Sequence, residues 1–100
     1  MIKIWLDDLR KPPGDYLWVR SVNEAIHAIE SAEKSQTQIS VIDCDHDLGD
    51  YANDGGDGIK LLDWLEAYSR CYRIRLHTMN PVGRENMRRI IRRNQWKEVF

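Results

Sequence analysis

Short apolar runs alternate with segments of helical spacing along this chain, and that alternation restricts the fold more than any other feature. The runs predicted to be strands are Met1 to Leu6, Tyr16 to Arg20, Ile39 to Cys44, Tyr72 to Leu76 and Trp96 to Phe100. Strands that alternate with helices indicate an open, mostly parallel sheet, and we expect helices on both of its faces.

Three helices are predicted from apolar residues that recur at intervals of three and four. The first stripe is Val22, Ala25, Ile26 and Ile29, the second runs from Ile59 to about Ser69, and the third is Met87, Ile90 and Ile91. The connection between the first two strands is the exception, because it is short and contains Pro12 and Pro13. It has no room for a crossover helix, so we expect a single turn there.

The length of the chain limits its organisation. One hundred residues give room for one core, and we expect a single domain over residues 1–100. No apolar run approaches the roughly 20 residues of a membrane span, and the first residues lack the apolar stretch of a signal peptide. We therefore expect a cytoplasmic protein with no membrane partner, while its oligomeric state stays open.

Acidic residues follow two of the predicted strands. Asp7 and Asp8 come after the first strand and Asp45 after the third, at the edge where open parallel sheets bind ligands. Three carboxylates repel one another unless a cation neutralises them, and oxygen ligands suit Mg²⁺ or Mn²⁺. Alternatively, these residues simply favour turns and caps. Asp43 either supports this site by hydrogen bonding or is a polar residue of the sheet whose hydrogen bonds are made elsewhere in the protein.

Two histidines are candidates for acid and base chemistry. His77 follows the fourth strand and is the best candidate, because histidine titrates near neutral pH. A histidine at a strand end can equally be structural. His46, between Asp45 and Asp47, is either a second catalytic histidine or a residue that orients the base.

The start of the third helix is a candidate anion site. Asn80 and Pro81 open this helix, with the proline at a position that suits it. Thr78, Asn80, Arg84 and the first amides of the helix could hold phosphate oxygens. The alternative is that Asn80 only caps the helix.

The net charge of −1 conceals an uneven distribution. Residues 1–69 contain 6 Lys/Arg and 14 Asp/Glu, whereas residues 70–100 contain 9 Lys/Arg and 2 Asp/Glu. In the third helix, Arg88/Arg92 and Arg89/Arg93 are expected to stack on the outer face. This basic face is either simply solvated or contacts the phosphates of a nucleic acid.

Three motifs together resemble the cyclic-phosphate processing receiver domain, a divergent branch of response-regulator receivers. The motifs are Trp5-Leu6-Asp7-Asp8-Leu9-Arg10, Asp45-His46-Asp47-Leu48-Gly49 and His77-Thr78-Met79-Asn80-Pro81-Val82-Gly83 with Met87. The resemblance covers nearly the whole chain and implies a receiver-like, flavodoxin-like sheet of order 2-1-3-4-5. Compared with a receiver, we expect this chain to have a reduced first helix and no last helix.

The resemblance also implies roles for single residues. Asp7 and Asp8 match the acidic pair that binds the cation in receivers, and Asp45 matches the phospho-acceptor aspartate. Thr78 lies near the receivers' hydroxyl residue, while His46, His77 and Asn80 match positions of the family's own motifs.

The leading hypothesis is a metal-assisted phosphoesterase that opens a cyclic phosphate. Its substrate is a 2',3'-cyclic phosphate at an RNA end, as in RNA repair, or a cyclic nucleotide. A non-catalytic module that binds a phosphate ligand or a nucleic-acid end is the alternative. A switch phosphorylated on Asp45 ranks last, because Lys97 lies inside the predicted fifth strand and not after it, where a signalling receiver has its lysine.

Overall fold

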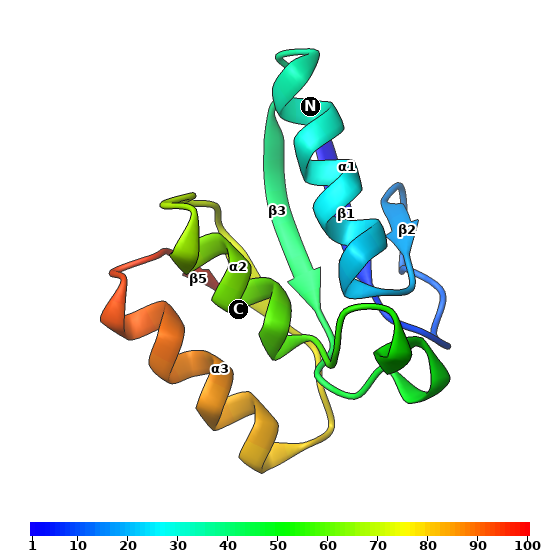
Figure 1. Cartoon of the computed structure of the whole chain (residues 1–100), viewed down its shortest axis with the longest axis vertical. Coiled ribbons are helices and arrows are strands. Elements are labelled where there is room, and N and C mark those ends of the chain that lie inside the picture. Colours follow the sequence, from blue (N-terminus) through cyan, green and yellow to red (C-terminus); the bar gives the residue numbers. More distant parts are fainter.

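The structure is a computed structural model that describes residues 1–100, with five strands and three α-helices (Figure 1). The strands are β1 (Ile2–Leu6), β2 (Leu17–Val19), β3 (Ile39–Cys44), β4 (Ile74–Leu76) and β5 (Glu98–Val99). The helices are α1 (Val22–Lys34), α2 (Ile59–Ala67) and α3 (Pro81–Arg93), and a 3₁₀ helix, η1, spans Gly49–Asn53. Every predicted element is present. The predicted strands at 16–20, 72–76 and 96–100 are shorter than expected.

The strands form one parallel sheet of order β2-β1-β3-β4-β5, which confirms the predicted receiver-like α/β fold. The two longest strands, β1 and β3, are neighbours in the sheet, and the edge strands β2 and β5 have three and two residues. No helix connects β1 to β2, as predicted. Because every strand pair is parallel, the carboxyl ends of all the strands lie at one edge of the sheet.

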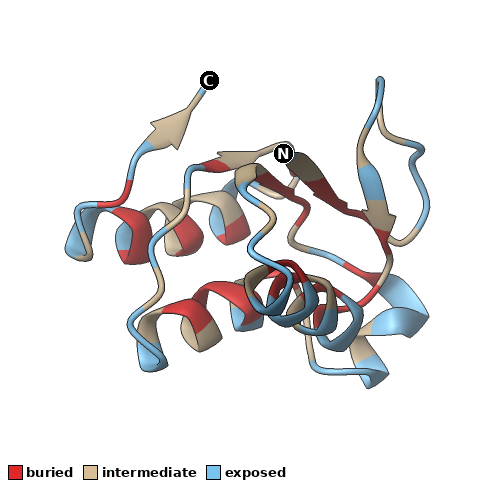
Figure 2. Ribbon diagram, turned by 90° about the horizontal axis from the view of Figure 1, so that it is seen from above, coloured by how far each residue is buried: buried red, intermediate tan, exposed pale blue.

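All three helices lie on one side of the sheet, so the expectation of helices on both faces is wrong (Figure 2). The reason is the direction of the crossovers. The connections from β2 to β3, β3 to β4 and β4 to β5 all move the same way across the sheet, and right-handed crossovers then place their helices on the same face. Only the connection from β1 to β2 moves the other way, and it has no helix.

The core lies between the sheet and its helix layer. Strand residues Ile4, Leu6, Ile42 and Ile74 are fully buried there and share one cluster with residues of all three helices. Burial of such side chains contributes about 1.5–3 kcal/mol each. The alternate strand residues point to the other face of the sheet, which we call the helix-free face.

Side-chain caps fix where two helices begin. The Ser21 hydroxyl accepts a hydrogen bond from the Glu24 N–H at the start of α1, and the Asn80 side chain accepts one from the Gly83 N–H at the start of α3.

None of the helices has the length and apolar character that a membrane span requires.

Candidate functional site

Three residues continue the hydrogen bonding of the sheet just beyond its strands. The N–H of Asp7 donates to the Val19 carbonyl, that of Asp45 to the Leu6 carbonyl, and that of His77 to the Cys44 carbonyl. Each of the three follows directly on a strand. These bonds fix Asp7, Asp45 and His77 side by side at the carboxyl edge, where the sequence predicts a site.

The carboxylate of Asp7 is buried, and each of its oxygens contacts two groups of the protein. Its Oδ1 accepts hydrogen bonds from the backbone N–H groups of Leu9 and Arg10, both at 2.9 Å. Its Oδ2 lies 3.1 Å from Nε of Arg10 and 3.0 Å from Nε2 of His77. Burial alone raises the pKa of Asp7, but these hydrogen bonds and the charge of Arg10 outweigh it and hold the pKa below its usual range.

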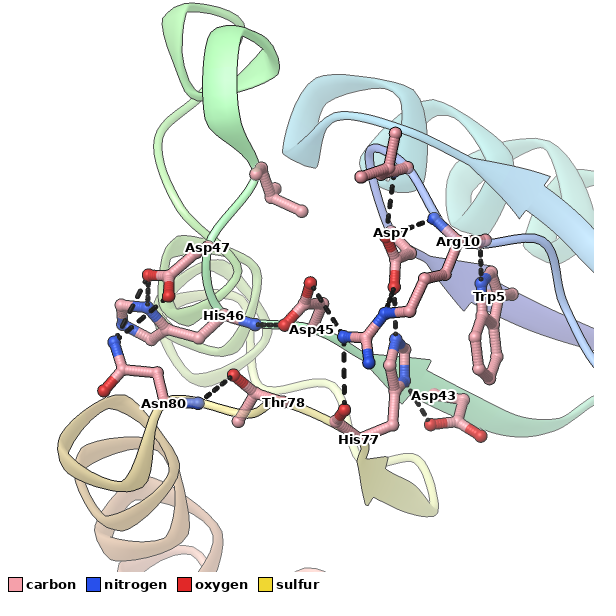
Figure 3. A network of polar contacts seen from close by, with 12 residues as sticks. Trp5, Asp7, Arg10, Asp43, Asp45, His46, Asp47, His77, Thr78 and Asn80 are labelled. Atoms are coloured by element: carbon pink, nitrogen blue, oxygen red, sulfur yellow. Dashed lines mark hydrogen bonds and ion pairs between the residues drawn. The ribbon is translucent and has the colours of Figure 1, made fainter.

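The imidazole of His77 lies between two carboxylates (Figure 3). Its Nδ1 is 2.7 Å from Oδ1 of Asp43 and its Nε2 is 3.0 Å from Oδ2 of Asp7. The ring stacks flat on the indole of Trp5, with centroids 3.8 Å apart and planes inclined by 4°. Asp43 therefore contacts the site directly, in agreement with the first of the two interpretations left open for it.

Only a doubly protonated ring can donate hydrogen bonds to both carboxylates, because a neutral imidazole has a single N–H. The Asp43 carboxylate is itself buried and lies 3.1 Å from the Arg75 guanidinium. The two acceptors and the stacked indole fix the orientation of His77. This geometry suits a group that holds a proton at Nε2 and delivers it in one direction.

Arg10 bridges the two acidic parts of the site, and no separate role is predicted for it in the sequence analysis. Its guanidinium contacts Oδ2 of Asp7 at 3.1 Å and Oδ2 of Asp45 at 3.3 Å. Although burial alone would lower the pKa of Arg10, the attraction of Asp7 and Asp45 raises it. The side chain is 45% exposed, so Arg10 can leave this position without breaking the core.

The structure has two compact sets of possible metal ligands, one of Asp7, Asp45 and His77 and the other of His46, Asp47 and Asp57. Single donor atoms of Asp7, Asp45 and His77 all lie within 4.8 Å of one another. Asp8, which the sequence places with Asp7 and Asp45, is not in this set. Asp8 nevertheless lies near Asp7 and Asp45, because their charges, together with burial, raise the pKa of Asp8.

The charges at this edge are not balanced by protein groups alone. Four carboxylates, those of Asp7, Asp8, Asp43 and Asp45, face three basic groups, the guanidiniums of Arg10 and Arg75 and the imidazole of His77. A hard divalent cation matches both the excess negative charge and the oxygen-rich donor set. The residues present therefore fit the predicted cation.

Thr78, Asn80 and Arg84 come together at the start of α3, but much of their polar capacity is used within the protein. The Thr78 hydroxyl is buried and accepts a hydrogen bond from the Asn80 N–H at 3.1 Å. The Asn80 side chain caps α3, and the Arg84 guanidinium donates to the Thr78 carbonyl. Asn80 has the capping role that the sequence allowed.

His46 lies apart from His77 and faces α3 (Figure 3). Its Nδ1 is 2.8 Å from Oδ1 of Asp47, and this contact is the main reason that the pKa of Asp47 lies below its usual range. A methyl group on Gly83 would lie 2.5 Å from Cγ of His46, so the ring packs on bare backbone. His46 therefore links the strand-end loop to α3 and does not contact the carboxylate partners of His77.

The arginines of α3 do not form the predicted outer stripe. Arg88 turns toward the sheet and forms an ion pair with Glu98 at 2.6 Å, so its placement on the outer face is wrong. Arg93 contacts Glu66 of α2 at 2.8 Å, and Arg92 contacts Glu85 at 3.4 Å. These ion pairs reduce the positive charge that the helix offers to a nucleic acid.

Sequence reasoning overlooked Trp5, Arg10 and Arg75 as site residues. Trp5 and Arg10 lie in the motif around Asp7 and Asp8, and the spacing of three between Asp7 and Arg10 is a usable signal for an ion pair. Arg75 alternates with the core residues of β4 and is two residues before His77, so strand periodicity places both on one face.

An open parallel sheet of order β2-β1-β3-β4-β5, with acidic residues directly after β1 and β3, defines a receiver-like domain. The family model of the cyclic-phosphate processing receiver domain matches residues 2–93, and the chain belongs to this family. A search of the curated proteins finds no match to the chain.

Proposed function

We propose that this domain is a metal-assisted phosphoesterase that opens a cyclic phosphate, either at an RNA end or in a cyclic nucleotide. The observation that carries the proposal is the geometry of His77, which is held between Asp43 and Asp7 directly beside Asp45. Membership of a family tied to cyclic-phosphate processing supports the same substrate class.

The reaction needs one proton to leave a water and one to reach the departing ribose oxygen. The water gives up one proton to the bulk solvent as its oxygen bonds to phosphorus, the bond from phosphorus to one ribose oxygen breaks, and the products carry a phosphomonoester and a free hydroxyl. His77, held between its two carboxylates, supplies the proton to the ribose oxygen from Nε2. Asp43 keeps Nδ1 protonated and the ring in place.

Asp7, Asp8 and Asp45 are assigned to the cation. A histidine that binds a cation through Nε2 cannot also transfer a proton from that atom, so His77 is kept for acid and base work. The bound cation would polarise a phosphoryl oxygen and lower the pKa of a bound water. Thr78, Asn80 and Arg84 lie beside this edge and are assigned to the phosphate oxygens.

The first test is hydrolysis of a 2',3'-cyclic nucleotide by the purified chain, followed by chromatography of the nucleotides. With Mg²⁺ or Mn²⁺ we expect conversion to a linear monophosphate, and with EDTA we expect the rate to fall by at least a hundredfold. Intact substrate after prolonged incubation with several divalent metals would contradict the phosphoesterase proposal.

Asp43→Asn tests the positioning of His77. We expect kcat to fall about 10- to 100-fold with little change in KM, the usual range for a residue that orients a functional group. Asp15→Asn, on the exposed loop, is the matched control. An unchanged kcat in a folded Asp43→Asn variant would remove Asp43 from the mechanism.

A further inference from the structure

The helix-free face carries a continuous row of side chains across the sheet. The strand registers align Trp18 of β2, Trp5 of β1, Asp43 of β3, Arg75 of β4 and Val99 of β5. Side chains of cross-strand partners point to the same face. His77 contacts Trp5 and Asp43, so the candidate catalytic histidine lies on this face and not in the helix layer, with 8% of its side chain exposed.

The charges that this face exposes are positive. Strand alternation places Lys3, Arg73 and Lys97 here together with Arg75, and none of these three forms an ion pair. Arg73 and Lys97 are exposed. The carboxylates on this side are buried, and each forms an ion pair with an arginine: Asp7 and Asp45 with Arg10, and Asp43 with Arg75.

Two half-buried aromatic residues of the β2 segment accompany these cations. The Lys3 ammonium lies 4.5 Å from the ring centroid of Tyr16, and the Arg20 guanidinium lies 4.3 Å from that of Trp18. Aromatic rings on a sheet face, interleaved with arginine and lysine, are a common surface for stacked bases and their phosphates.

The charge of this face decides between possible occupants. A second copy of the chain, packed face to face, would bring like charges together. A polyanion with flat apolar groups matches both the cations and the aromatic rings. Single-stranded RNA has this chemistry, and only RNA carries the 2'-hydroxyl from which a 2',3'-cyclic phosphate forms.

We infer that the helix-free face binds single-stranded RNA and leads its 3' end to His77. The assignment of the 3' end rests on the proposed function, whereas binding of the strand does not. The chain then acts on RNA ends in preference to free cyclic nucleotides, because the nucleotides before the cyclic phosphate add contacts along Tyr16, Trp18 and the cations.

Fluorescence anisotropy with a labelled 12-nucleotide single-stranded RNA tests the inference. The RNA ends in a 3'-hydroxyl and the buffer contains EDTA, so hydrolysis does not enter. The variant Lys3→Glu/Arg73→Glu/Lys97→Glu is expected to bind at least tenfold more weakly than the unaltered chain, and affinity should fall steeply with salt. Trp18→Ala is expected to weaken binding severalfold.

The control has the same change of charge on the helix layer: Lys34→Glu/Lys60→Glu/Arg89→Glu, all at exposed positions. It should bind within about twofold of the unaltered chain. Equal loss in both triple variants, equal binding of a duplex, or no binding at 100 µM protein would overturn the inference. Hydrolysis of a cyclic nucleotide without RNA binding refutes the inference alone, and RNA binding without hydrolysis refutes the proposed function alone.

Discussion

His77→Ala is expected to lower kcat for cyclic-phosphate hydrolysis by roughly 100- to 10,000-fold, the range for loss of a positioned acid or base. Nε2 of His77 is 3.0 Å from Asp7, and no other imidazole reaches that position, because His46 faces Asp47 and α3. The measurement is the steady-state rate with a 2',3'-cyclic nucleotide and Mg²⁺ or Mn²⁺.

The loss of the ring also uncovers Trp5 and leaves Asp7 and Asp43 with one partner fewer. His77→Gln keeps a hydrogen bond donor but cannot transfer a proton. This variant therefore distinguishes a loss of proton transfer from a loss of the folded structure. His27→Ala, at an exposed position of α1, is the matched control and should retain full activity. Substantial turnover in a folded His77→Gln variant would show that another group delivers the proton.

Gly58→Ala is expected to be among the most destabilising single substitutions in the chain. A Cβ at this position would lie 1.9 Å from the backbone oxygen of Asp45, which is backbone and cannot rotate away. The start of α2 or the end of β3 must therefore shift. We expect a loss of about 2–3 kcal/mol in the free energy of unfolding, as for a severe overpacking substitution.

In a domain of this size that loss lowers Tm by roughly 10–20 °C. Gly14→Ala is the control, because nothing lies within 4 Å of the corresponding Cβ, and its Tm should change little. The shift displaces Asp45, so hydrolysis should fall even below the new Tm. Equal melting temperatures for the two alanine variants would mean that the contact between Gly58 and Asp45 relaxes without cost.

Local patterns in the sequence predicted the elements well, but they did not predict the layering. Apolar stripes such as Met87, Ile90 and Ile91 report which face of a helix is buried, and all three are indeed buried. They do not report on which side of the sheet the helix lies. That depends on the strand order and the crossover directions together, and the missing helix between β1 and β2 is the deciding fact.

The site was predictable only where strand ends determine position. Asp7, Asp45 and His77 each follow a strand, so parallel pairing alone brings them together. Arg10 reaches Asp45 through the path of the loop after β1, and no periodicity in the sequence encodes that path. The arginines of α3 show the same limit, because Glu98 and Glu66, which bind Arg88 and Arg93, lie on other elements.

The shortness of the outer strands has a consequence for self-association. The sheet ends in β2, with three residues, and in β5, with two. A backbone edge of this length offers few free amide and carbonyl groups in register, so it is a poor template for a strand from a neighbouring molecule. Edge-to-edge growth of the sheet into aggregates is therefore disfavoured, although one broad face of the sheet carries no helix.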